Sequence, residues 1–147
     1  MNISKKEYPK YADAHAPKSD LLGDTAHAFL VGGLICTVAQ GLTTLWGALG
    51  MEKEDAGLLT SVILVFASAL LTALGVFDRI AKFAGGGTLV PITGFANSVV
   101  SAAIDAKSEG FILGLGSAIF TVAGPVLLYG TAAGTLYGVI YWIFSLF

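Results

Sequence analysis

The stretch from Phe83 to Asp105 constrains the fold more than any other part of the chain. It is uncharged until Asp105, so it can enter a membrane, yet residues that weaken or break helices interrupt it: Gly85, Gly86, Gly87, Pro91 and Gly94. Irregular backbone is not tolerated in contact with lipid, because its polar groups would lack hydrogen-bond partners. Such a segment must be shielded by protein or line a water-filled cavity, which is typical of pores and transporters.

Long uncharged stretches predict an all-α, polytopic membrane protein. Of 147 residues, 55% are hydrophobic and only 12% are charged, against about 25% charged residues in soluble domains. Since about 20 apolar residues span a bilayer as a helix, we expect a transmembrane domain over 25–147 behind a polar arm at 1–24. The expected elements are spans at 26–49 and 57–77, a broken or re-entrant segment at 83–105, a half-helix at about 110–120 and a span at about 121–144.

The distribution of Lys and Arg predicts the orientation. The arm holds four of them, the first loop only Lys53, and the junction after the second span Arg79 and Lys82. Cytoplasmic flanks are enriched in these residues, so we expect a cytoplasmic N-terminus. If 83–105 re-enters, Lys107 also lies inside and the count is seven against one; if it crosses, the count is six against two. The rule favours re-entry weakly, and both topologies stay open.

The apolar tail is too long for one straight span. Its 38 residues, 110–147, would cover about 57 Å as a helix, whereas the hydrocarbon core is about 30 Å thick. The tail must tilt, kink or turn, and we expect this at Gly124-Pro125. Two tightly connected spans are the alternative.

Polar residues at helical spacing predict a lined path. Gln40 in the first span and Asn97 in the broken segment are costly in hydrocarbon unless they face a partner or water, so we expect both to face the path, with Ser98 beside Asn97. The simpler alternative is close packing, since membrane helices meet through small residues. Close packing is the favoured explanation for the row in the second span, Ser61, Ser68, Thr72 and Gly75.

The second half of the broken segment predicts an anion-attracting helix end. A half-helix should begin near Thr93, and we expect Thr93 to cap it. The free N–H groups and the positive dipole end of this half-helix would then point into the membrane. Gly85–Gly87 would let a ligand approach the backbone closely, and with Pro91 they shape the break. The glycines are not a nucleotide-binding loop, because no Gly-Lys-Ser/Thr follows them.

The remaining polar residues suggest no catalytic or metal-binding site. Asp78, Arg79 and Lys82 are expected to form an ion pair at the cytoplasmic mouth, to contact a partner or to anchor the membrane edge. The acidic cluster after the first span, Glu52, Glu54 and Asp55, is most simply a solvated loop. We expect no catalysis, cofactor or metal, and no nucleic-acid partner, because catalytic constellations and basic patches are missing from the sequence.

Several short sequence motifs resemble those of the stage V sporulation protein AC/AEB family. They include AFLVGGLIC at 28–36 with AQG at 39–41, SALLT at 68–72 with GVFDRI at 75–80, and, as the strongest match, VPITGFANS at 90–98 followed by KSEG at 107–110. The resemblance covers about 26–130. The polar arm and the overall length are closer to the AC-type members than to the shorter AEB-type members.

The resemblance implies a subunit of the spore inner-membrane complex that moves dipicolinic acid, into the forespore during sporulation and out with calcium during germination. It implies an AEB-type membrane subunit and a soluble, thiolase-like AD-type subunit as partners in a hetero-oligomer, and channel-like, tension-sensitive behaviour. Two rival hypotheses are a self-sufficient mechanosensitive channel of low selectivity and a non-conducting scaffold that recruits the soluble subunit through Arg79, Lys82 and the arm.

Overall fold

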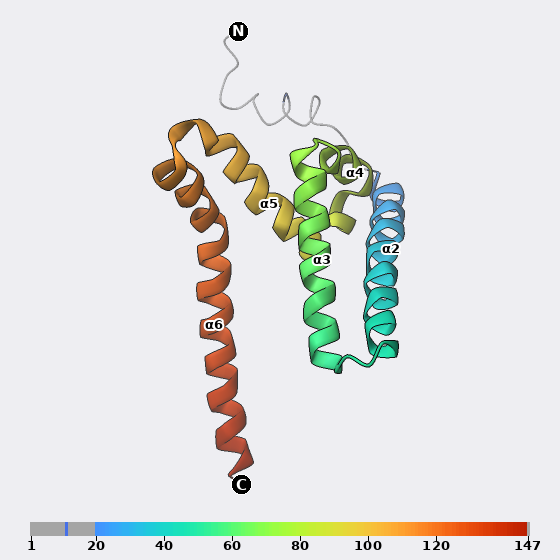
Figure 1. Cartoon of the computed structure of the whole chain (residues 1–147), viewed down its shortest axis with the longest axis vertical. Helices are drawn as coiled ribbons and strands as arrows, with labels where there is room; N and C mark the ends of the chain where they lie inside the picture. The colour runs from blue at the N-terminus through green and yellow to red at the C-terminus, as the bar shows by residue number, and fades with distance from the viewer. Residues whose placement is uncertain (1–10, 12–19, 147) are drawn as a thin grey trace.

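The computed structural model describes Tyr11 and residues 20–146 (Figure 1). Within them the expected all-α class is confirmed, and three stretches are long and apolar enough to span a membrane, α2, α3 and Phe111–Ser145. Apart from Tyr11 and residues 20–24, the predicted polar arm lies outside the described residues. The elements are α2 (Leu21–Ala48), α3 (Lys53–Ala73), α4 (Phe77–Ala84), the 3-10 helix η1 (Gly85–Thr88), α5 (Ile92–Asp105), the 3-10 helix η2 (Ala106–Glu109), the π-helix η3 (Phe111–Gly116) and α6 (Ser117–Ser145).

Helices α2 and α3 form an antiparallel pair, with the Thr43 and Thr60 hydroxyls 3.0 Å apart between them. Both helices begin earlier than expected, at Leu21 instead of 26 and at Lys53 instead of 57. The physical reason is electrostatic, because acidic side chains in the first turn of a helix interact favourably with its dipole. Asp24 occupies this position in α2, and Glu54 and Asp55 occupy it in α3, so most of the predicted acidic loop is helical.

The charged junction forms a short amphipathic helix, α4. Phe77 and Ala84 are buried on one side, while Asp78, Arg79 and Lys82 are exposed on the other. Lys82 Nζ lies 2.7 Å from Asp78 Oδ2 in a solvent-exposed i,i+4 pair. Helix α4 therefore packs its apolar side on η1, α2 and α3 and turns its charges toward solvent.

The broken segment is interrupted where its glycines and proline predict. Gly85 ends α4 with φ +50°, a conformation that side chains disfavour, and Pro91 precedes α5 with φ −68° and ψ 159°. Between them the chain forms η1 and the exposed turn at Leu89-Val90. Two separate pieces of helix therefore replace a continuous span.

Helix α5 runs parallel to α3, which decides between crossing and re-entry. Ser68 Oγ donates to the Thr93 carbonyl at 2.6 Å, and Thr72 Oγ1 donates to Asn97 Oδ1 at 2.8 Å. Both helices advance four residues between these two contacts, so they run in the same direction. Helix α5 therefore returns to the end of the α2–α3 pair where α3 ends (Figure 1). The segment 83–105 is re-entrant, entering and leaving at the same end.

The tail is a single helical stretch, and the predicted division into a half-helix at 110–120 and a span from 121 is corrected. The irregularity lies in η3, where Leu115 N donates to Gly110 O at 2.9 Å, and α6 continues through Pro125. A π-turn accommodates an extra residue locally, and membrane helices tolerate an internal proline. Helix α6 packs on α5 and η3 and stands apart from α2 and α3 (Figure 1).

Candidate functional site at the re-entrant segment

The re-entrant segment is held against the start of α2 by a close backbone contact. A Cβ added at Gly87 would collide with the Ala28 backbone, and one added at Gly32 would lie 3.2 Å from the Gly87 carbonyl oxygen. Nearby, the rings of His27 and Phe83 lie 4.4 Å apart. The space beside Gly87 is thus occupied by α2, which corrects the expectation that this glycine lets a ligand approach.

The other two glycines of the triplet differ from Gly87. A Cβ added at Gly85 or at Gly86 would meet no atom of the described residues within 4 Å. Gly85 serves the turn through its positive φ, while Gly86 has neither a close neighbour nor a positive φ. Access for a ligand to the backbone therefore stays a prediction for Gly85 and Gly86.

Helix α5 starts at Ile92, close to the predicted position, but Thr93 does not cap it. Pro91 occupies the cap position, and no side chain caps this helix in the described residues. Thr93 lies one residue inside the first turn, past the position from which a cap bonds the free N–H groups. Thr93 is only 7% exposed, and its Oγ1 is buried without a hydrogen-bond partner among the described residues.

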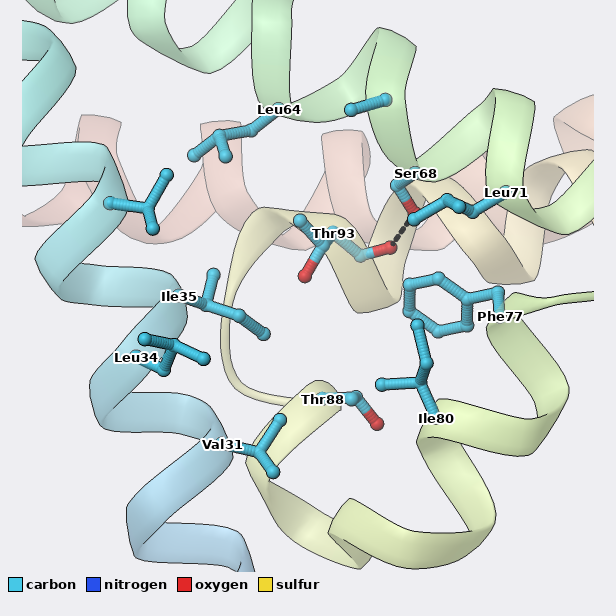
Figure 2. A pocket seen from close by; sticks show the side chains of 12 residues that line it. Val31, Leu34, Ile35, Leu64, Ser68, Leu71, Phe77, Ile80, Thr88 and Thr93 are labelled. Atoms are coloured by element: carbon cyan, nitrogen blue, oxygen red, sulfur yellow. Dashed lines mark hydrogen bonds between the residues drawn. The ribbon is translucent and has the colours of Figure 1, made fainter.

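A pocket of about 290 Å³ lies beneath the re-entrant segment, between α2, α3, α4 and η1 (Figure 2). Two of its three hydroxyls are satisfied, since Ser68 donates to the Thr93 carbonyl and Thr88 donates to the Gly85 carbonyl at 3.2 Å. The Thr93 hydroxyl is the third, and Figure 2 shows it on the pocket side. The other lining residues are apolar: Val31, Leu34, Ile35, Val38, Leu64, Ala67, Leu71, Phe77 and Ile80.

Asn97 and Ser98 lie one turn further along α5 in different environments. Asn97 is half-buried, and its carboxamide oxygen accepts the hydrogen bond from Thr72. Ser98 is exposed, and its hydroxyl donates to the Phe95 carbonyl of its own helix at 2.8 Å. Asn97 therefore ties α5 to α3, whereas Ser98 belongs to the open face of α5.

Gln40 lies on a different surface. It lines a shallow, exposed groove along α2 with Cys36, Thr37, Gly41 and Thr44, and its Nε2 lies 3.3 Å from Thr44 Oγ1. The structure does not bring Gln40 to the pocket of the re-entrant segment, so the expectation that Gln40 and Asn97 face one path does not hold within a single chain.

Sequence reasoning treated Ser68 and Thr72 only as members of a packing row and did not connect them to the re-entrant segment. Their spacing of four residues matches that of Thr93 and Asn97, the two residues they bond. This matched spacing is the signal that could have predicted the parallel packing of α5 on α3. No comparable spacing in the sequence predicted that Phe77 and Ile80 of α4 would line the pocket.

Comparisons with known proteins give two matches. The family model described as SpoVAC/SpoVAEB sporulation membrane protein matches residues 24–140. The chain is 42% identical over 146 residues to "Stage V sporulation protein AC" of Bacillus subtilis (strain 168), covering 99% of this chain and 97% of that protein. No solved structure matches it significantly. The chain belongs to the SpoVAC/SpoVAEB family of sporulation membrane proteins.

Proposed function

We propose that this chain is a membrane subunit of the spore inner-membrane complex that conducts dipicolinic acid, taking it up during sporulation and releasing it with calcium during germination. The observation that carries the proposal is that α5 starts level with the interior of the candidate span α3. Thr93 is level with Ser68, five residues before the end of α3, which corresponds to a depth of about 8 Å. The partial positive charge of a helix N-terminus at such a depth favours carboxylates.

The polar groups for the path would come from more than one surface. Asn97 and Ser98 offer a carboxamide and a hydroxyl along α5, and Gln40 offers a second carboxamide on α2. Because Gln40 and Asn97 lie on separate surfaces of one chain, a path lined by both requires another subunit. We therefore propose a hetero-oligomer with an AEB-type membrane subunit and a soluble AD-type subunit.

The orientation follows from the positive charges. Re-entry places Lys107 at the same end as Arg79 and Lys82, and the start of α2 lies there too (Figure 1). Lys53 lies at the other end, on the loop side of α3. Since cytoplasmic flanks are enriched in Lys and Arg, we propose that the N-terminus faces the cytoplasm.

Efflux from liposomes tests the proposal. The purified chain is reconstituted in liposomes loaded with dipicolinate, alone and with the AEB-type subunit, and efflux is followed before and after an osmotic downshift. We expect efflux that needs both subunits and exceeds that of a similarly sized monocarboxylate control. Efflux from the chain alone that rises with tension and ignores the solute would instead support the self-sufficient channel. Binding of the soluble subunit without efflux would support the scaffold.

A further inference from the structure

We propose that a second groove, between α5 and the start of the tail, binds an aminophospholipid of the phosphatidylethanolamine type. The phosphate of the lipid binds Lys107, its ammonium binds Glu109, and the upper part of one acyl chain lies in the groove. This inference is independent of the solute that the protein conducts. It rests on the apolar walls of the groove, its place at the membrane boundary and the charges at its mouth.

The α5–α6 groove has a volume of about 140 Å³ and two apolar walls. Helix α5, which runs from α3 toward the start of the tail (Figure 1), supplies one wall, and the tail supplies the other. The apolar lining residues are Val99, Val100, Ala103 and Ile104 on α5, and Leu115 and Ile119 on the tail. Most of them are only half-buried, so the groove leaves apolar surface open for part of an acyl chain.

The membrane boundary crosses the mouth of this groove. Lys107 and Glu109 lie on η2, whereas the three apolar residues at 111–113 are 82%, 80% and 84% exposed. Because exposed apolar side chains are favoured in hydrocarbon and charged ones in water, the boundary lies near Gly110. On α5 the same change occurs at 104–105, from isoleucine to aspartate. Headgroups are therefore level with Lys107 and Glu109, and acyl chains are level with the walls.

The charges at the mouth are available to a ligand. Lys107 lines the groove. Glu109 lies beside the tail wall, because a Cβ added at Gly114, next to Leu115, would lie 2.8 Å from the Glu109 Cβ. Within the described part of the chain, a salt bridge joins Lys82 to Asp78 and none involves Lys107 or Glu109. A lysine ammonium donates hydrogen bonds and a carboxylate accepts them, so together they suit a headgroup that carries both charges.

The pattern of charges favours phosphatidylethanolamine over two other common headgroups. Asp105 adds a second carboxylate close to Lys107 in the sequence, so acidic residues lie on both sides of it. The anionic headgroup of phosphatidylglycerol could bind Lys107, but both carboxylates would repel it. The trimethylammonium of phosphatidylcholine has no N–H, whereas the ammonium of phosphatidylethanolamine donates charge-assisted hydrogen bonds to a carboxylate. Of the three lipids, phosphatidylethanolamine therefore satisfies both Lys107 and Glu109.

Native mass spectrometry tests the proposal on the full chain. The purified protein in detergent is titrated with phosphatidylethanolamine, phosphatidylcholine and phosphatidylglycerol that share the same acyl chains, and the lipid-bound fraction gives an affinity for each. We expect phosphatidylethanolamine to bind several-fold more tightly than either of the others. Equal affinities, or tightest binding of phosphatidylglycerol, would overturn the proposal.

Two charge variants test the headgroup contacts. Lys107→Gln should weaken the binding of phosphatidylethanolamine by up to about fivefold, which is the range for a solvent-exposed pair of charges. Glu109→Gln should lower this affinity to that of phosphatidylcholine, because the acceptor for the ammonium is lost. Lys53→Gln and Glu54→Gln are matched controls, since both residues are exposed at the far end of α3. A preference for phosphatidylethanolamine that survives Glu109→Gln, or that the controls abolish equally, would contradict the site.

A third variant tests the acyl-chain contact. Val100→Trp narrows the groove and should weaken the binding of all three lipids alike, while their order of affinity stays the same. Val126→Trp is its control, because Val126 is 55% exposed on α6 away from the groove. Undiminished binding by the Val100→Trp protein would show that the lipid does not occupy the groove.

Discussion

At the scale of single residues, glycines define where the re-entrant segment packs closely, both against α2 and within itself. Gly87 meets the backbone of α2 at Ala28, and a Cβ added at Gly94 would lie 2.9 Å from the Leu89 Cα. A glycine that faces a ligand and one that faces a neighbouring helix look identical in sequence. The sequence therefore predicted which residues would be special in this segment, but not which atoms they approach.

Gly87→Ala should destabilise the fold, because the new Cβ collides with the backbone at Ala28 and backbone cannot move aside cheaply. Overpacking of this kind costs about 1–3 kcal/mol, which should appear as a lower Tm for the purified protein in detergent. Gly86→Ala is the matched control, since its Cβ would meet no described atom within 4 Å. Equal losses in the two variants would show that the contact with α2 is not what Gly87 provides.

Asn97→Leu should lower dipicolinate efflux while membrane insertion stays intact, because it removes a carboxamide from the expected path. Asn97 also bonds Thr72, so a packing defect must be separated from a lost path group. Thr72→Val supplies this control, since it removes the bond but keeps the carboxamide. We expect a several-fold loss of efflux for Asn97→Leu and a smaller one for Thr72→Val. Normal efflux from a well-inserted Asn97→Leu protein would remove Asn97 from the path.

At the scale of helices, the sequence predicted the existence of the elements better than their ends. The uncharged stretches located both members of the α2–α3 pair, and the glycines with Pro91 located the break. The helix starts at Leu21 and Lys53 were missed, because polar residues were treated as loop although acidic side chains favour a first turn. Thr93 was misplaced for a similar reason, because the cap position depends on where Pro91 lets the helix begin.

The charged side of α4 should contribute little to stability. The Lys82–Asp78 pair is 2.7 Å long, but its side chains are 76% and 67% exposed, and solvent-exposed pairs of this kind contribute at most about 0.5 kcal/mol. The double variant Arg79→Glu/Lys82→Glu should therefore keep its Tm within about 2–4 °C of the unmodified protein.

The same variant separates a conduit from a scaffold. A scaffold that recruits the soluble AD-type subunit through Arg79 and Lys82 should lose that subunit in a pull-down from reconstituted vesicles. A conduit should retain dipicolinate efflux with an altered rate. A Tm lowered by much more than expected would show instead that α4 has a structural role that its exposure does not suggest.

At the scale of the whole molecule, the arrangement is a three-span protein with one re-entrant segment. Within the described part of the chain, helix α6 packs mainly on α5 and η3, and most of its surface is exposed. The sequence could not decide between re-entry and crossing, because one additional lysine, Lys107, changes the positive-inside count only slightly. The decision depends on a long-range contact, the parallel bonds of Ser68 and Thr72 to α5, which periodicity within one helix does not reveal.

The sidedness of single cysteines tests this topology most directly. Cysteines at Lys53, Lys82, Lys107 and Ser145, each introduced alone in a Cys36→Ser background, are labelled with a membrane-impermeant maleimide in sealed vesicles of defined orientation. Re-entry predicts that positions 82 and 107 react from one side and that positions 53 and 145 react from the other. Labelling of positions 82 and 107 from opposite sides would mean that 83–105 crosses the membrane, and would contradict the account of the re-entrant segment and its pocket.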